Sequence, residues 1–138
     1  MSLARDAIIR RRLARANAAI GEASVLLDAG YEDAAVSRLY YACFYAVSAL
    51  LARHDLASSK HTGVLAFFNR HFVRPGIVTR ELGQFYNDLF SYRQQSDYED
   101  FAEFDVEWVR SLLAQGAQFV AHVARLVELP GEDSSTSH

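Results

Sequence analysis

Charged and hydroxyl-bearing side chains occur within two stretches that are otherwise apolar at helical spacing. Arg38 lies in the most apolar stretch of the chain, with Tyr41 three and Tyr45 seven positions later, so the three residues share roughly one helix face. A second apolar stripe is continued at the same spacing by Arg93 and then Asp97. Because a guanidinium keeps its proton, each of these arginines needs an anion or access to water.

The two arginines permit two interpretations. The planar fork of an arginine side chain matches two oxygens of a phosphate, so Arg38 and Arg93 would together suit an anion-binding site. Alternatively, Asp97 or Asp88 accepts Arg38 in a buried ion pair that fixes the packing of the helices. Charged groups with perturbed environments occur in both kinds of cluster, so the sequence leaves both interpretations open.

Two further groups of charged residues have simpler explanations. The first predicted helix carries the arginines Arg5, Arg10, Arg11, Arg12 and Arg15. The segment before the last predicted helix carries the acids Asp97, Glu99, Asp100, Glu103 and Asp105. We interpret the arginines as a solvated helix face and not as an RNA-binding surface. We interpret the acids as stabilising a helix N-terminus, whose dipole favours negative charge, and not as a magnesium site.

Several other kinds of site lack their residues in this sequence. A carboxylate-bridged di-iron bundle needs histidines preceded three residues earlier by glutamate, and none of His54, His61, His71 and His122 has one. There is also no Gly-rich phosphate loop, Ser-His-Asp series or zinc-ligand spacing. We therefore expect no metal ion and no cofactor. The single cysteine, Cys43, lies in an apolar run without a disulfide partner, which favours a reducing cytoplasm and makes it a poor nucleophile.

The apolar pattern predicts an all-α fold, because helical spacing recurs along the chain and no alternation typical of strands occurs. The predicted helices cover approximately residues 9–27, 32–54, 59–73, 79–97 and 105–127. Gly30 is expected to end the first helix, Ser58 or Ser59 to cap the third, and Thr79 to cap the fourth. Short connections favour antiparallel neighbours, so we expect an up-and-down bundle of four long helices with the short third helix lying across it.

The chain is expected to form one domain over residues 1–129, followed by a small, polar and disordered tail over residues 130–138. The only stretch that approaches membrane-spanning length, residues 34–52, contains Arg38 and three tyrosines. Such a composition suits a helix buried in protein, so we expect no membrane association. No signal peptide is recognisable at the start of the sequence, and we expect a cytoplasmic protein.

Three segments, in this order, carry a family resemblance. They are residues 34–46, which include S-R-L-Y-Y-A-C-F, residues 59–64, which read S-K-H-T-G-V, and residues 93–98, which read R-Q-Q-S-D-Y. Together they resemble the HEPN domain, and most closely its subgroup with a central S-R-x-Y-Y-A-x-F helix and a later R-x-x-x-D-Y motif. The resemblance extends over about residues 5–127, nearly the whole chain.

The resemblance implies a bundle of four to five helices that forms a homodimer through a polar groove. HEPN domains are often encoded beside a minimal nucleotidyltransferase in a toxin-antitoxin pair, which implies a nucleotidyltransferase partner and an RNA or nucleotide ligand. Many members are metal-independent endoribonucleases. In those, an arginine holds the phosphate, and a histidine four to six residues later helps to activate the ribose 2′-hydroxyl. Arg93 matches the arginine, whereas Asp97, Tyr98 and Glu99 occupy the positions of the histidine.

Three functional hypotheses follow. In the leading one, the protein belongs to a nucleotidyltransferase/HEPN module and binds a partner protein and the phosphate of a nucleotide or RNA in a groove at a dimer interface. The candidate phosphate-binding residues are Arg38, Tyr41, Tyr45, His61 and Arg93.

The second hypothesis is a metal-independent endoribonuclease toxin, in which Arg93 acts with Asp97, Tyr98 or His61. A tyrosine near its reference pKa of about 10 is a poor base at neutral pH, and Asp97 would need a raised pKa to serve. His61, at the predicted start of the third helix, is otherwise a capping or packing residue. The third hypothesis is a helical interaction protein whose polar cluster is purely structural.

Overall fold

The computed structural model of the chain describes residues 3–98 and 103–135, with side chains described for residues 3–97 and 103–128. It contains the helices α1 (Leu3–Asp28), α2 (Glu32–Arg53), α3 (His61–Phe68), α4 (Arg80–Tyr98) and α5 (Val106–Ser135). A π-helical segment, Asn69–Val73, continues α3 without a break. No strand occurs in the described part of the chain, so the predicted all-α class is confirmed.

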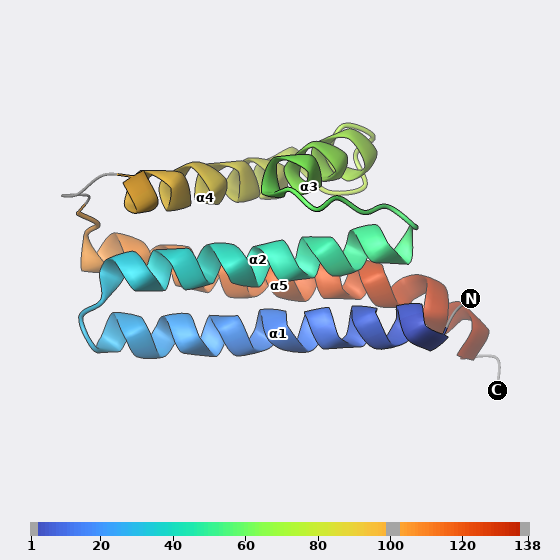
Figure 1. Ribbon diagram of the computed structural model, residues 1–138, viewed down its shortest axis with the longest axis horizontal. Helices are drawn as coiled ribbons and strands as arrows, with labels where there is room; N and C mark the ends of the chain where they lie inside the picture. Colours follow the sequence, from blue (N-terminus) through green and yellow to red (C-terminus); the bar gives the residue numbers. More distant parts are fainter. Residues whose placement is uncertain (1–2, 99–102, 136–138) are drawn as a thin grey trace.

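The helix α2 lies at the centre of the molecule. It contacts α1, α3, α4 and α5 (Figure 1) because it is apolar on nearly all of its faces, as the sequence predicts. Its length and composition would also suit a membrane span, but 67% of its most apolar window is buried inside the bundle. Among the described residues α2 therefore has the burial of a core helix.

The contact between α1 and α2 depends on small residues. Ala16, Ala19 and Ala23 of α1 are fully or almost fully buried, and side chains of this size let two helices run close together over their whole length. The turn that joins them ends α1 at Gly30, which has a φ of 89°. There the Gly30 amide donates to the carbonyl of Leu27 and the Tyr31 amide to that of Leu26, which is a Schellman motif and confirms the predicted helix end.

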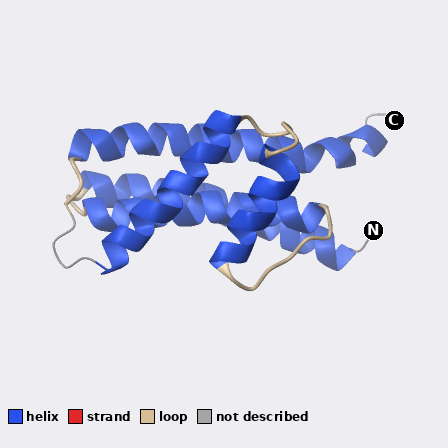
Figure 2. Ribbon diagram, turned by 90° about the horizontal axis from the view of Figure 1, so that it is seen from above, coloured by secondary structure: helices blue, strands red, loops and turns tan. Residues whose placement is uncertain are grey.

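The helices α3 and α4 form a layer on the side of α2 opposite α1 (Figure 1). Seen from above, they cross the long helices obliquely (Figure 2), so α4 does not run along the bundle as the up-and-down prediction implies. Their aromatic residues anchor this layer, since Phe68 stacks edge-on against Tyr86 at 5.4 Å between ring centroids and both side chains are fully buried.

Two predicted caps can be compared with the structure. The Thr79 hydroxyl accepts a hydrogen bond from the amide of Leu82 at 3.2 Å, so that cap is confirmed. The cap at α3 was assigned wrongly, because Lys60 is the N-cap residue and Ser58 bonds only to the backbone of Lys60.

The predicted domain over residues 1–129 and tail over residues 130–138 remain a prediction. The structure continues α5 to Ser135, so the helix includes Pro130, which has no backbone N–H to donate. The remainder of the predicted tail, residues 136–138, lies outside the described residues.

Candidate functional site

Three elements bring together most of the residues that the sequence singles out. The central helix α2 contributes Arg38 and Tyr41, the first residue of α3 is His61, and the last turns of α4 contribute Arg93. The Cζ atoms of Arg38 and Arg93 each lie 5.2 Å from the centroid of the Tyr41 ring. Two guanidinium groups from different helices therefore share one tyrosine. We call the group formed by Arg38, Tyr40, Tyr41, His61 and Arg93 the tyrosine–arginine centre.

Each of these arginines has its own carboxylate. Arg38 Nη1 donates to Oε1 of Glu22 on α1 at 3.0 Å, and Arg93 Nε lies 3.3 Å from Oδ2 of Asp97, one turn further along α4. The structural hypothesis of an Arg38 ion pair with Asp97 or Asp88 is therefore wrong. The physical reason is the direction of the side chains, since Arg38 faces α1 whereas Asp97 shares the face of Arg93.

The ion pair of Arg93 leaves a hydrogen-bond donor unused. Although the Nε and Oδ2 atoms are within ion-pair distance, their geometry does not make a hydrogen bond, and the buried Nε has no hydrogen-bond acceptor among the described residues. Burying an N–H group without an acceptor costs about 1–3 kcal/mol. Arg93 is thus held against the rings of Tyr40 and Tyr41, at 5.4 and 5.2 Å, without using its full donor capacity.

His61 is fixed by aromatic neighbours and by one hydrogen bond. Its ring stacks on Phe44 at 4.4 Å between centroids, and its Nδ1 lies 2.9 Å from the hydroxyl of Tyr40. Burial and then the positive charge of Arg93 lower the pKa of His61, which keeps the imidazole neutral at neutral pH. Burial raises the pKa of Tyr40 to about 12, although Arg93 opposes the shift, so this hydroxyl keeps its proton.

Two of the predicted site residues lie elsewhere or outside the described side chains. The Tyr45 ring is 6.2 Å from that of Tyr41, but its hydroxyl accepts a hydrogen bond from Arg15 of α1 at 3.0 Å. The structure places Tyr98 at the end of α4, and its side chain lies outside the described part of the chain. Tyr45 thus faces a different surface from the tyrosine–arginine centre.

Sequence reasoning missed three contributors to the centre. Glu22 and Arg38 are separated by 16 residues, and Tyr40 and His61 by 21, so helical periodicity gave no sign of either contact. Phe44 follows Tyr40 by one helical turn, and this i, i+4 spacing is the one available signal that both rings share a face.

Of the acidic residues before α5, Asp105 has the capping role that the sequence predicts, whereas Asp97 is paired with Arg93. The amide of Trp108 donates to Oδ2 of Asp105 at 3.0 Å, which satisfies a free donor of the first turn of α5. Glu99 and Asp100 lie outside the described residues. The described side chains contain no group of three or more potential metal ligands. Burial raises the pKa of the Cys43 thiol far above its usual range, so this cysteine stays protonated.

Comparison with known proteins places the chain in a family. The chain is 42% identical to a UPF0332 protein of Thermotoga maritima over 90% of its own length and 94% of that protein. It is 30% identical to a protein of Methanocaldococcus jannaschii named "Putative toxin", over 93% of the chain and 90% of that protein. It is also 31% identical to a UPF0332 protein of Gloeobacter violaceus, over 77% of the chain and 85% of that protein. The model of the HEPN domain family matches residues 9–126, and the chain belongs to this family.

Proposed function

We propose that this protein is a toxin-type HEPN component that binds the phosphate groups of RNA or a nucleotide through its tyrosine–arginine centre. The observation that carries the proposal is the position of Arg38 and Arg93, both 5.2 Å from the centroid of the Tyr41 ring. Two guanidinium groups converge there from α2 and α4, at a place where the side chain of Arg38 is 33% exposed and that of Arg93 22% exposed.

The stacking geometry supports a phosphate ligand. A guanidinium that lies over a ring keeps its N–H groups free to donate in its own plane, and an arginine has five such donors. The contacts of Arg38 with Glu22 and of Arg93 with Asp97 each engage one nitrogen. The remaining donors suit the non-bridging oxygens of a phosphodiester, and the tyrosine ring is a stacking surface for a base.

The setting of this activity is also a proposal. The Methanocaldococcus jannaschii relative is named "Putative toxin", and the HEPN resemblance implies a homodimer and a nucleotidyltransferase partner. The single cysteine, Cys43, favours a cytoplasmic location. Sedimentation equilibrium measures the oligomeric state, and a monomer at micromolar concentration would contradict the dimeric groove. Co-purification with any nucleotidyltransferase encoded beside the gene measures the partnership.

The proposal is tested by fluorescence anisotropy with a labelled single-stranded RNA in EDTA. We expect Arg93→Ala and Arg38→Ala each to weaken binding at least about tenfold, which corresponds to about 1.4 kcal/mol. Arg110→Ala is the matched control, because Arg110 also forms an exposed ion pair, with Asp28 at 3.4 Å, but lies on α5. Equal RNA and nucleotide binding by the parent protein and Arg93→Ala would sink the proposal.

Metal-independent RNA cleavage is a second candidate, favoured by the place of His61. In the tautomer whose Nδ1–H donates to the Tyr40 hydroxyl oxygen, Nε2 of the neutral imidazole is the nitrogen that accepts a proton. His61 would take the proton of a ribose 2′-hydroxyl, whose oxygen attacks the neighbouring phosphorus to form a 2′,3′-cyclic phosphate. The bond to the 5′-oxygen breaks, and this oxygen leaves as a hydroxyl after it takes a proton from water. Arg93 would hold the non-bridging oxygens of the phosphate. In this arrangement the catalytic histidine comes from α3 and not from the end of α4.

Incubating purified protein with total RNA and tRNA in EDTA tests this candidate. We expect the parent protein to cleave RNA. The cleavage rate of His61→Ala should be at least about a hundredfold lower, since a general base contributes factors of this size. Growth arrest on expression that His61→Ala and Arg93→Ala both relieve would support it. Intact RNA together with unimpaired binding would leave the protein as a binding component only.

A further inference from the structure

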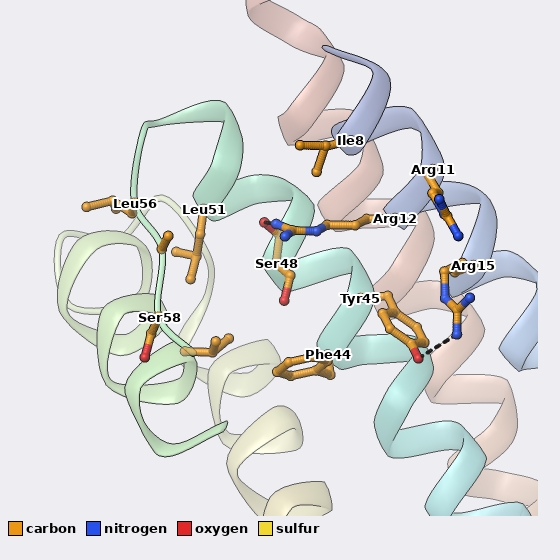
Figure 3. Close-up of a pocket in the computed structure, with 12 residues that line it drawn as sticks. Ile8, Arg11, Arg12, Arg15, Phe44, Tyr45, Ser48, Leu51, Leu56 and Ser58 are labelled. Atoms are coloured by element: carbon orange, nitrogen blue, oxygen red, sulfur yellow. Dashed lines mark hydrogen bonds between the residues drawn. The ribbon is translucent and has the colours of Figure 1, made fainter. Parts of the chain in front are cut away.

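A second group of arginines lines a pocket on the α1 side of α2. The pocket has a volume of about 410 Å³ and lies between α1, α2 and the segment that leads to α3 (Figure 3). Arg11, Arg12 and Arg15 of α1 lie on one side, and Tyr45 and Ser48 of α2 face them (Figure 3). We call the pocket lined by these five residues and Ser58 the α1 arginine pocket.

The positive charges of this pocket are held in place but not neutralised. Arg12 Nη1 donates to the backbone carbonyl of Ser48 at 3.2 Å, and Arg15 Nη2 donates to the Tyr45 hydroxyl at 3.0 Å. Both acceptors are uncharged. None of Arg11, Arg12 and Arg15 forms an ion pair with a described residue, whereas the neighbouring Arg5 is paired with Asp55. Three guanidinium groups without an ion pair to a described residue therefore line one concavity, and the carboxylate of Glu22 acts on Arg15 only from beyond ion-pair distance.

A missing ion pair alone would not distinguish these arginines from a solvated face. Arg10 and Arg70 also form no ion pair with a described residue, but they are exposed and line none of the described pockets. The sequence-based interpretation of a solvated face thus suits Arg10. It does not suit Arg11, Arg12 and Arg15, which line the pocket.

The rest of the pocket is apolar and aromatic. Its wall is formed by Ile8, Phe44, Leu51, Leu56 and Val64. The Tyr45 ring stacks under the Arg15 guanidinium, with Cζ 4.8 Å from the ring centroid. A ligand that fits this arrangement has several negative charges at one end and a flat apolar body at the other. Ligand pockets of several hundred Å³ with a few convergent polar groups are typical of small-molecule sites.

We propose that the α1 arginine pocket binds a nucleoside 5′-phosphate, with the phosphate on Arg11, Arg12 and Arg15 and the base against Phe44 and the apolar wall. The ligand is either a free nucleotide or the phosphorylated 5′ end of an RNA, which present the same chemistry. The pocket is distinct from the tyrosine–arginine centre, although Phe44 contacts both, since it also stacks on His61.

The test is calorimetric titration of AMP in EDTA, carried out in Arg93→Ala protein so that the tyrosine–arginine centre does not contribute. We expect the further double change Arg11→Gln/Arg15→Gln to weaken AMP binding at least tenfold. Both side chains are exposed, so folding should be retained, and circular dichroism checks this. Arg10→Gln is the matched control on the same helix, and we expect it to change the affinity less than twofold. Adenosine, which lacks the phosphate, should bind at least tenfold more weakly than AMP.

Three results would overturn the proposal. They are undiminished AMP binding by the Arg93→Ala protein that also carries Arg11→Gln/Arg15→Gln, an equal loss with Arg10→Gln, and no AMP binding to the Arg93→Ala protein at millimolar concentration. If the first of these results is accompanied by loss of a co-purifying partner protein from the Arg11→Gln/Arg15→Gln variant, the pocket binds an acidic protein surface instead of AMP. A 5′-phosphorylated and a 5′-hydroxyl RNA octamer, titrated in the same way, distinguish the two sources of the phosphate. Because Arg93 is absent throughout, failure here leaves the proposed function untouched.

Discussion

The tyrosine–arginine centre and the α1 arginine pocket use the same pair of residue types in different electrical settings. In the centre, Arg93 lies 5.2 Å from the Tyr41 ring and is paired with Asp97, and the adjoining Tyr40 is fully buried. In the pocket, Arg15 lies 4.8 Å from the Tyr45 ring, and its acceptor is the uncharged hydroxyl of that same tyrosine. The centre is thus part of the core with balanced charge, and the pocket is an open surface with surplus charge.

This difference separates two uses of an arginine–tyrosine contact. A stacked arginine with a carboxylate contributes to packing and offers only its remaining donors to a ligand. A stacked arginine without one keeps its full charge for an anion. If the centre is both a part of the hydrophobic core and a phosphate-binding site, substitutions there should change the stability of the protein as well as its affinity for RNA.

Removing a core ring from the centre should have the largest effect. We expect Tyr40→Ala to lower the free energy of unfolding by about 3–5 kcal/mol, because it leaves a cavity among buried aromatic side chains. Tyr45→Ala should cost at most about half as much, since Tyr45 is only partly buried. Urea denaturation measures both. Tyr40→Phe, which keeps the ring and loses the hydrogen bond to His61, should cost about 0.5–1.5 kcal/mol. Equal losses of unfolding free energy for Tyr40→Ala and Tyr45→Ala would contradict the difference in burial between the tyrosine–arginine centre and the α1 arginine pocket.

The charge of the centre should be visible in the salt dependence of RNA binding. Each phosphate contact to single-stranded nucleic acid contributes about 0.7 to the slope of log K against log salt concentration. We expect Arg93→Ala to reduce that slope by about 0.7, as one lost contact requires. Anisotropy titrations at several salt concentrations measure it, and Arg110→Ala should leave the slope unchanged. A weaker affinity with an unaltered slope would mean that Arg93 acts through packing and not through phosphate.

Releasing Arg38 from its carboxylate should have a smaller effect on stability and an opposite effect on binding. The Glu22–Arg38 pair is partly exposed, so Glu22→Gln should cost only about 0.2–1 kcal/mol of unfolding free energy. The same change should strengthen RNA binding, because the positive charge of Arg38 is then no longer balanced by the Glu22 carboxylate and acts fully on the phosphate. Asp28→Asn, which breaks the Arg110 pair, is the control and should not alter RNA binding. Weaker binding by Glu22→Gln would indicate that the ion pair positions Arg38 for its ligand.

Protonation of His61 should give the smallest change, because this side chain is only partly buried. Burial lowers its pKa in the folded protein, so the unfolded chain takes up a proton first as the pH falls. Stability should therefore be constant above the ordinary histidine pKa of about 6.5, decline as the pH falls from there to the lowered pKa of the folded protein, and level off below it.

Urea midpoints at pH 7.5 and 5.5 measure this decline, and we expect it to be smaller in His61→Gln. His54, whose pKa is also lowered by burial, shifts stability in the same direction, so His54→Gln provides the comparison. An unchanged pH dependence in both variants would show that neither histidine is responsible.

The helices and the polar residues at the ends of two apolar stripes can be recognised in the sequence, because both follow from spacing within one helix. Gly30 and Thr79 could be read as helix boundaries since their roles depend on neighbouring backbone atoms. Arg38 and Arg93 could be singled out because each interrupts an apolar face at a fixed helical interval.

The contacts of these residues depend on how the helices pack against one another in the tertiary structure. The packing of α1 and α3 against α2 pairs Arg38 with Glu22 and brings His61 to Tyr40, contacts that span 16 and 21 residues. The same packing turns Arg11, Arg12 and Arg15 into the lining of a pocket, although the sequence presents them as an ordinary charged face. Helical periodicity says which residues share a face, but the packing of all the helices together decides what that face meets.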